Sequence, residues 1–412
     1  MSREACELIG EVSQMIRVLI ADDSAFMRKV LSDMFASQPD FEVAGTARNG
    51  QETVDKVMQL SPDLVTLDVN MPVMDGLEAL DIIMKEHPMP VVMLSSLTQK
   101  GTEQTVKALA LGAVDFISKA GGSISSIDGI TSEILEKCRA AAKAHARKTI
   151  VASPPKPVSA GPPTMKRIQL PLRQGYKPPE STKPQEPAAS INTYAKRNNP
   201  LLKRNANPPA PPSKPSAVPM TDMGRGAEKL VVIGTSTGGP QALQNVITRL
   251  PGNLPCGVVI VQHMPAGFTK ALADRLNTIS EIAVKEAEDG ESIRPGQVYI
   301  APGNYHLRIR NGTQIVLGQD PPVGNHRPAV NVMFSSVASL GRKLVAVIMT
   351  GMGCDGCDGM REIKEAGGYS IAQDEPTCVV YGMPKAVVDA GLADEIKPVQ
   401  NIAQAIVEAV KR

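Results

Sequence analysis

The sequence predicts two α/β domains, each built around a mainly parallel sheet, joined by a proline-rich linker. Three observations lead to this prediction. The chain has 412 residues, which at about 100–200 residues per domain suits two or three domains. Both ends of the chain alternate apolar strands with amphipathic helices, a pattern typical of a parallel sheet covered on both faces. Finally, 17 of the 34 prolines fall in residues 151–220.

Composition excludes several classes of protein. The chain has 44 Lys and Arg against 42 Asp and Glu, a formal net charge of +2. No apolar run approaches the roughly 18 residues that span a bilayer, and the acidic N-terminus does not resemble a secretory signal. Six scattered cysteines do not make a disulfide framework. We therefore expect a soluble, cytoplasmic protein without membrane insertion.

The ends of the two predicted domains follow from these patterns. The first strand begins at Ile16, so residues 1–14 are expected to be an extension, and Met15 is an alternative start. The expected domains are a first α/β domain over 15–142, a linker over 143–224 and a second α/β domain over 225–412.

The linker is basic. Residues 151–220 hold 11 Lys or Arg and two acidic residues, a local balance of +9 (11 − 2), which leaves −7 for the rest of the chain. Few large apolar residues occur here, so burial cannot offset the entropy of ordering, and we expect a flexible tether. A basic run also suits nucleic acid or anionic lipid. The acidic balance of the remaining chain argues against a DNA-binding domain and favours the tether.

Reactive side chains end the strands of the N-terminal block, which we expect over residues 16–23, 41–47, 63–69, 90–96 and 113–119. Along the chain these side chains are Asp22 and Asp23, Asp68, Ser95 and Lys119. Ligands of parallel sheets lie at the carboxyl ends of strands. Carboxylates that converge at one place repel one another, and a divalent cation between them removes this repulsion. A hydroxyl and an ammonium nearby can donate hydrogen bonds to a phosphoryl oxygen. Any one of them alone would be an ordinary cap, but five such side chains at the ends of four of the five strands favour a phosphoryl-transfer site.

The motifs ADDS, LDVNMPVMDGLEAL and FISK resemble those of the receiver domain of two-component response regulators, over about residues 15–120. The resemblance implies a five-stranded, flavodoxin-like domain in which Asp68 accepts a phosphoryl group. It further implies the following roles: Mg²⁺ held by Asp22, Asp23, Asp68 and the backbone carbonyl of Asn70, with Ser95, Phe116 and Lys119 as the switch. Ala120 departs from the pattern, because receivers usually have proline there.

In the C-terminal block we expect strands over residues 229–234, 257–263, 343–351 and 369–375. The turn after the first of them, Gly234 to Gly239, fits two interpretations. It matches G-x-S-x-G, the strand-to-helix turn that exposes a nucleophilic serine, here Ser236. It also resembles a glycine-rich phosphate loop, but the glycines lack G-x-G-x-x-G spacing and the next strand ends in Gln262-His263, without the acid that a ribose needs. A histidine at that position suits a general base.

A third member of the site would be a carboxylate that orients the histidine. The next strand end that carries reactive side chains has the sequence IMTGMGCDGCDGM, which contains Asp355 and Asp358. Its glycines leave backbone N–H groups free to bind an oxyanion. The order Ser, His, Asp differs from that of α/β-hydrolases and favours a separate fold. Two other histidines, His306 in an apparent hairpin and His326 in a loop, could line a pocket but are more typical of structural positions.

The pair Cys354-x-x-Cys357 allows a redox or zinc interpretation. No second CxxC and no histidine at ligand spacing accompany it. We therefore favour two small packed residues beside Asp355.

Over nearly the whole chain, the motifs GTSTGG, QHMPAGFT, YIAPGNYHL, HRPAVNVMFSS, TGMGCDG and AQDE…CVVYGMPKA resemble the CheB family, chemotaxis response regulators with protein-glutamate methylesterase activity. The resemblance implies Ser236 as nucleophile, His263 as general base and Asp355 as third member. It also places the backbone N–H of Met352 in the oxyanion hole and Thr237 beside the site. The cysteine pair departs from the family, which commonly has small residues other than cysteine there.

The resemblance implies a phosphorylation-activated serine esterase. Its substrates would be glutamate γ-methyl esters on the cytoplasmic helices of chemoreceptors, with glutamine deamidation as a second reaction. A histidine kinase would be the phosphodonor, Mg²⁺ would serve the receiver alone, the esterase would need no cofactor, and the chain would act as a monomer without nucleic acid. Two rivals are a non-enzymatic adaptor and a receiver-linked nicotinamide oxidoreductase. The intact Ser236, His263 and Asp355 argue against the first and Gln262-His263 against the second.

Overall fold

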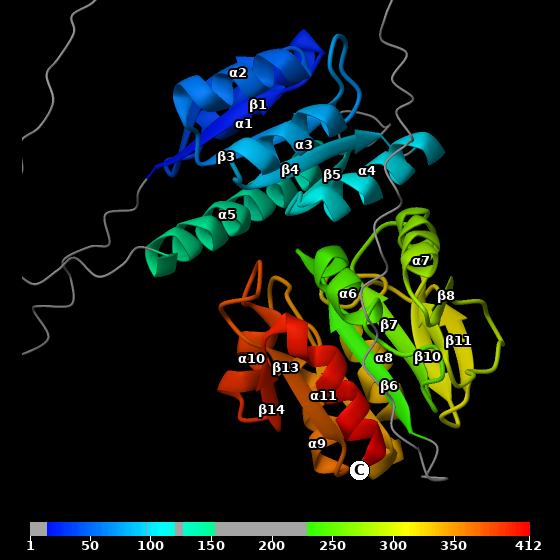
Figure 1. Cartoon of the computed structure of the whole chain (residues 1–412). Coiled ribbons are helices and arrows are strands. Elements are labelled where there is room, and N and C mark those ends of the chain that lie inside the picture. The colour runs from blue at the N-terminus through cyan, green and yellow to red at the C-terminus, as the bar shows by residue number, and fades with distance from the viewer. Residues whose placement is uncertain (1–14, 97, 120–126, 153–228) are drawn as a thin grey trace, which may run out of the picture. The chain divides into compact units, whose positions relative to one another are not determined.

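The computed structural model describes residues 15–96, 98–119, 127–152 and 229–412 (Figure 1). The predicted extension 1–14, Ala120 and residues 153–224 of the predicted linker lie outside the described residues.

The N-terminal domain contains a five-stranded parallel sheet in the order β2-β1-β3-β4-β5. Its strands are β1 (Ile16–Ala21), β2 (Phe41–Ala47), β3 (Leu64–Asp68), β4 (Val91–Ser96) and β5 (Asp115–Lys119). All five predicted strands are present, and the predicted fold class is confirmed. The first is shorter than expected, because Asp22 leaves the strand and its carboxylate accepts the N–H of Ser24 in a turn.

Helices cover both faces of this sheet. They are α1 (Ala25–Ala36), α2 (Gly50–Leu60), α3 (Gly76–Glu86), α4 (Gln99–Leu111) and α5 (Ile127–Ala152). On one face, Leu31 and Phe35 of α1 share a core with Leu135 of α5 and the strand residues Val18 and Ile20. On the other face, α2, α3 and α4 pack against the strand residues that alternate with these, such as Leu19 and Ala21 of β1. This is the period-2 alternation of strands that bury both faces.

Capping residues set where these helices begin. Ser24, Asn49, Asp75 and Thr98 each accept a backbone N–H from the first turn of the helix that follows, which satisfies a donor that the helix itself leaves open. At the other end of the domain, α5 continues to Ala152. The predicted linker therefore begins inside a helix, and the domain boundaries stay predictions.

The C-terminal domain contains a seven-stranded parallel sheet in the order β14-β13-β12-β6-β7-β9-β8. Its strands are β6 (Leu230–Thr235), β7 (Gly257–Gln262), β8 (Ala283–Glu286), β9 (Gln297–Ile300), β12 (Leu344–Ile348), β13 (Tyr369–Gln373) and β14 (Glu395–Lys397). A separate antiparallel hairpin pairs β10 (His306–Arg310) with β11 (Gln314–Gly318). The expected parallel architecture and the apparent hairpin at His306 are both present.

Helices again cover both faces of the sheet. They are α6 (Gly239–Ile247), α7 (Phe268–Ile279), α8 (Val330–Val337), α9 (Cys357–Glu365), α10 (Met383–Asp389) and α11 (Val399–Lys411), with a 3₁₀ segment η3 (Ala338–Lys343) after α8. One core joins the sheet to α6, α7 and α11, and the other joins it to α8, α9, α10 and the β10–β11 hairpin. Among the described residues, no helix has the length and apolar character that crossing a membrane requires.

The strand order determines where the chemistry lies. β6 is flanked by β12 on one side and by β7 on the other. All three strands run in the same direction, so the loops that follow them meet at one edge of the sheet. Those loops carry Ser236, His263 and Asp355, which are far apart along the chain.

Candidate functional site

Ser236 lies in a sharp turn between β6 and α6. Its backbone N–H donates to the carbonyl of Thr350 at 3.0 Å, and its own carbonyl accepts the N–H of Gly239 at 2.7 Å. Gly238 has a φ of 76°, in the left-handed region that favours glycine. The turn therefore presents the serine hydroxyl at the N-terminus of α6, where the helix dipole favours negative charge.

His263 follows β7 directly and contacts Ser236. Its backbone N–H donates to the carbonyl of Thr235 at 3.1 Å, which continues the pairing of β6 with β7. Its Nδ1 lies 3.2 Å from Ser236 Oγ, and its Nε2 lies 2.8 Å from Asp355 Oδ2. One imidazole thus connects the hydroxyl to the carboxylate, and its side chain is only 7% exposed.

Asp355 lies in the loop between β12 and α9 and accepts three hydrogen bonds. Besides His263, the backbone N–H groups of Val330 and Asn331 donate to its two oxygens at 2.6 and 2.9 Å. Burial alone would raise the pKa of Asp355, but the bonds from His263 and the two N–H groups outweigh it and leave the pKa below its usual value. The carboxylate is therefore ionised at neutral pH and can stabilise an imidazolium.

Gln262 connects the serine and histidine loops, a role that the sequence analysis did not anticipate. Its Nε2 donates to the backbone carbonyls of Ser236 and His263, each at 3.0 Å. The side chain is 2% exposed. The sequence shows a glutamine at a strand end but not that the neighbouring loop offers its carbonyl.

The structure decides between the alternatives that the residues left open. Asp358 lies on the first turn of α9 and is exposed, so Asp355 is the carboxylate that contacts the imidazole. His306 is fully buried in β10, where its Nε2 lies 3.1 Å from the carbonyl of Pro321. His326 stacks on His263, with ring centroids 3.8 Å apart and planes 14° apart.

Two further predicted residues lie next to the serine. Thr237 follows Ser236 in the chain, and its carbonyl accepts the hydroxyl of Thr350 at 2.9 Å. Met352 follows Gly351, where an added Cβ would lie 2.9 Å from Ser236 Cβ. The loop that holds Met352 therefore passes close to Ser236, and an oxyanion role for its N–H stays a prediction.

The prediction of two packed cysteines is wrong for Cys354. Cys354 is exposed, whereas Cys357 is partly buried and its Sγ lies 3.5 Å from the carbonyl of Ala386. Burial raises the pKa of the Cys357 thiol. Within the described part of the chain, the one cluster of three or more potential metal-ligating side chains does not include either cysteine.

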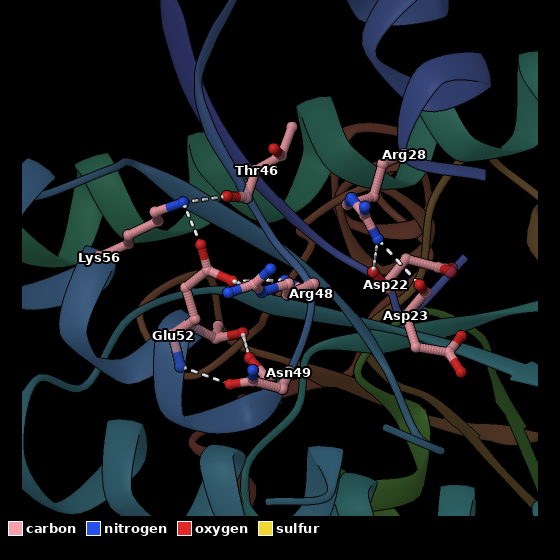
Figure 2. Close-up of polar contacts among 9 residues, drawn as sticks. Asp22, Asp23, Arg28, Thr46, Arg48, Asn49, Glu52 and Lys56 are labelled. Atoms are coloured by element: carbon pink, nitrogen blue, oxygen red, sulfur yellow. Dashed lines mark hydrogen bonds and ion pairs between the residues drawn. The ribbon is translucent and has the colours of Figure 1, made fainter. Parts of the chain in front are cut away.

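That cluster lies in the N-terminal domain and consists of Asp22, Asp23 and Asp68. Carboxylate oxygens of all three lie within 4.8 Å of one another. Figure 2 shows how the turn is held: the guanidinium of Arg28 donates to the backbone carbonyls of Asp22 and Asp23 at 2.7 and 2.9 Å. Arg28 therefore binds main-chain oxygens and not the carboxylates, and the all-oxygen donor set of the three carboxylates fits Mg²⁺.

Lys119 lies against the same carboxylates. Its Nζ is 2.8 Å from Asp22 Oδ2 and 2.8 Å from Asp68 Oδ2. Burial raises the pKa of Asp68, while the bond and the charge of Lys119 act in the opposite direction. The pKa of Lys119 itself is raised, because burial, which would lower it, is outweighed by the two carboxylates.

The other two predicted switch residues, Ser95 and Phe116, form hydrogen bonds with helices α4 and α5. Ser95 Oγ accepts a hydrogen bond from Thr105 Oγ1 at 2.6 Å and donates to the carbonyl of Gly101 at 3.2 Å, both on α4. Phe116 lies on β5, where its carbonyl accepts the ammonium of Lys137 at 2.7 Å. Ser95 is therefore tied to α4 in this conformation.

Comparison with known proteins agrees with both domains. The CheB methylesterase family model matches residues 231–406, and the response regulator receiver domain model matches residues 18–125. A protein of Symbiobacterium thermophilum named protein-glutamate methylesterase/protein-glutamine glutaminase is 45% identical over 97% of this chain and 98% of its own length. A protein of the same name from Halalkalibacterium halodurans is 44% identical over 96% of this chain and 99% of its own length.

Among solved structures, the CheB methylesterase catalytic domain of Thermotoga maritima is 49% identical, with a TM-score of 0.43, and the match covers 44% of this chain and 98% of that one. The full-length identities to curated relatives decide the assignment, and they confirm the resemblance found in the motifs. The chain belongs to the CheB family of protein-glutamate methylesterases/protein-glutamine glutaminases, in which a response regulator receiver domain precedes the methylesterase domain.

Proposed function

We propose that Ser236, His263 and Asp355 carry out the reaction of this family in the present chain, the hydrolysis of glutamate γ-methyl esters on chemoreceptors to glutamate and methanol. One observation carries the proposal. His263 lies between the other two side chains, 3.2 Å from the serine oxygen and 2.8 Å from the carboxylate. This is the geometry of a nucleophile, a general base and an orienting acid.

In the first half of the reaction, Ser236 Oγ attacks the ester carbonyl while its proton passes to His263 Nδ1. Asp355 accepts the N–H at Nε2, which leaves the Nδ1 lone pair facing the hydroxyl. The imidazolium that forms lies beside an ionised carboxylate, whose pKa is held low by its three donors. The oxyanion develops beside the Met352 N–H and the N-terminus of α6, and such donors typically account for about 10²–10³ in rate.

In the second half, His263 gives its proton to the departing methoxide, which leaves as methanol. The product is a glutamyl ester on Ser236. His263 then takes a proton from water as the water oxygen attacks that ester. It returns this proton to Ser236 Oγ as the bond to glutamate breaks, which releases glutamate and restores the enzyme. The same acyl chemistry on a glutamine side chain releases ammonia, which gives the deamidase activity. Every step uses side chains of this domain, and we propose that the esterase works without a cofactor.

In the receiver domain, Asp68 would take the phosphoryl group from a histidine kinase. Asp22, Asp23, Asp68 and the carbonyl of Asn70 would hold Mg²⁺, which neutralises phosphoryl charge when bound. Lys119 already contacts the acceptor carboxylate. Ser95 would leave its bonds to α4 to meet the phosphoryl oxygen, and Phe116 would change its packing on β5.

The receiver is proposed to restrain the esterase until Asp68 is phosphorylated. A linker keeps the effective concentration of one domain at the other high, so a weak interaction suffices and can be switched. Phosphorylation adds roughly −1.5 to −2 of charge at Asp68, which can change such an interaction. We propose that the enzyme acts as a monomer in the cytoplasm, on the cytoplasmic helices of its receptors.

The test is methanol release from methylated receptor membranes, with and without a small-molecule phosphodonor and Mg²⁺. Ser236→Ala removes the attacking oxygen and leaves the turn intact, so release should fall by about 10⁴–10⁶. The matched control is Asp358→Asn, an exposed acid in the first turn of α9, which should retain activity. Near-normal release by a folded Ser236→Ala variant would show that another residue is the nucleophile, whereas no release by the wild-type protein would favour the non-enzymatic adaptor.

A further inference from the structure

The ring of His326 lies on one face of the general base. The His263 and His326 rings are 3.8 Å apart at their centroids and nearly parallel, with 14° between their planes. The hydrogen bonds of His263 involve only its ring nitrogens, so they do not explain why a second ring lies on its face. The reaction described above does not need hydrogen bonds from the ring nitrogens of His326 to the substrate, so the contact calls for a role of its own.

The two bonds of His263 do not fix its ring completely. Nδ1 faces Ser236 and Nε2 faces Asp355, and ring nitrogens donate and accept through N–H groups and lone pairs that lie in the ring plane. The imidazole can therefore still rock about the line that joins its two nitrogens. Rocking bends both hydrogen bonds, and bonds weaken steeply as their angle departs from linearity. A flat group against the ring face opposes this motion.

The backbone around His326 is built to hold the ring in place. Val323 and His326 exchange two backbone hydrogen bonds of 3.1 and 3.0 Å across a tight turn. The central residues Gly324 and Asn325 both have positive φ, 57° and 66°, as in a type I′ turn. Arg327 then donates to the carbonyls of the preceding segment and to Asn304 Oδ1 at 2.6 Å. The position of His326 is thus fixed from both sides.

The same short segment reaches the third member of the site. Only a few residues after His326, the N–H groups of Val330 and Asn331 donate to Asp355. One stretch of chain therefore contacts His263 through a ring and Asp355 through its backbone. Displacing this stretch would disturb both partners of the base together.

We propose that His326 is a positioning residue for His263: its ring stacks on the imidazole and holds it in the plane that serves Ser236 and Asp355. This inference rests on the proposed function of those three residues. The ring is also suited to the imidazolium stage, because an aromatic face attracts a cation. Burial, and then the charge of His263, lower the pKa of His326 to about 4, so it is a neutral ring at neutral pH.

The experiment compares three substitutions in the full-length chain, activated by a phosphodonor with Mg²⁺. His326→Phe keeps a flat ring, whereas His326→Gln and His326→Ala remove it. Misplacement of a catalytic group by about 1 Å can lower rates about 10²-fold, so we expect kcat to fall about 10- to 100-fold in the Gln and Ala variants, with KM changed less than about twofold. The Phe variant should retain kcat within about threefold of the wild type.

The control is Val323→Ala, which alters an exposed side chain in the same turn and should leave kcat and KM unchanged. If His326→Phe is as impaired as His326→Gln, the proposal is overturned, because the ring nitrogens would then matter and not the ring face. A wild-type kcat in the Gln variant would also overturn it, as would a loss that lies in KM alone. If the Ala variant does not fold, the Phe and Gln pair decides.

Failure of this inference is separable from failure of the proposed function. Ser236→Ala is measured in the same assay. If that variant is inactive while His326→Gln is fully active, only the positioning role is lost. If Ser236→Ala is fully active, the assignment of the nucleophile fails first, whatever the His326 variants show.

Discussion

Asp355 illustrates how backbone groups set the properties of a single side chain. Its pKa lies below the ordinary 3.8, since three accepted hydrogen bonds outweigh burial. For a carboxyl group with a depressed pKa, the stabilisation is fully present above the unfolded value and is lost as pH falls through the folded value. The ionised group therefore stabilises the fold throughout the neutral range.

We predict that Asp355→Asn lowers kcat about 10⁴-fold, the size of the effect when an orienting acid is lost in a serine protease. It should also lower the free energy of unfolding at pH 7 by about 1–3 kcal/mol, because an amide nitrogen cannot accept from the N–H groups it faces. Urea denaturation followed by circular dichroism at pH 7 and pH 3 measures this. The gap between variant and wild type should narrow at pH 3; an equal gap at both pH values would contradict the prediction.

A second prediction at this scale concerns the cysteines beside Asp355. Replacing both Cys354 and Cys357 by Ala should leave activity within a few-fold, because Cys354 is exposed and the Sγ of Cys357 makes one weak hydrogen bond, to the carbonyl of Ala386. Metal analysis of the purified wild-type protein should find no zinc bound to the pair. Stoichiometric zinc that disappears in the double variant would establish a metal site here.

Ser236, His263 and Asp355 could be predicted from the sequence because each follows a strand in a recognisable motif. Gln262 and Asn331 could not, because their roles depend on which backbone groups face them from another loop. The choice of Asp355 over Asp358 could be made only from the family motif. The structure gives the physical reason: the first turn of α9 exposes Asp358 to solvent.

At the scale of elements, α8 holds the loop that carries Asp355. The side-chain oxygen of Asn331 accepts the N–H groups of Gly356 and Gly359 at 3.0 and 2.9 Å. These donors belong to the start of α9, where helical N–H groups have no partner in their own helix. Asn331 therefore caps α9 from a neighbouring helix.

We predict that Asn331→Ala destabilises the protein by about 1–3 kcal/mol, because it leaves donors unsatisfied, and that it lowers kcat by displacing Asp355. The control is Ser335→Ala on the same helix, whose hydroxyl makes an exposed bond to Glu362 and should change stability by about 0.5 kcal/mol or less. Thermal unfolding and methanol release measure both effects. Equal behaviour of the two variants would show that the cap does not hold the loop.

The longer elements were predictable and the shorter ones were not. Strands β6, β7, β12 and β13 are apolar and buried, so their sequences stand out. The strands β8, β9 and β14 have only four, four and three residues, and they mix polar with apolar side chains. These short segments are strands only because they pair with a neighbouring strand, and a single sequence does not show which strand that is.

At the scale of the whole molecule, the receiver should control the rate of the esterase. We predict that Asp68→Asn keeps basal methanol release but loses stimulation by a phosphodonor with Mg²⁺, since the acceptor carboxylate is gone. Titration with a phosphodonor in the presence and absence of Mg²⁺ measures this. Stimulation that persists in the Asn variant would show that another residue accepts the phosphoryl group.

Removing the receiver gives a separate prediction. If the unphosphorylated receiver restrains the esterase, a chain that lacks residues 1–224 should have higher basal activity than the full-length protein. The same truncation should remove all response to the phosphodonor. A folded fragment no more active than the unphosphorylated chain would mean that phosphorylation acts by improving the site or recruiting substrate.

The way Asp355 is held has an evolutionary consequence. Two of its three hydrogen-bond donors are main-chain N–H groups, of Val330 and Asn331. Since every amino acid except proline supplies such a group, drift in the gene at position 330 can replace the side chain without deleting the bond. At position 330, selection on this carboxylate therefore acts through the path of the chain more than through the identity of the side chain. Lineages could diverge widely around the site and still inherit the same chemistry.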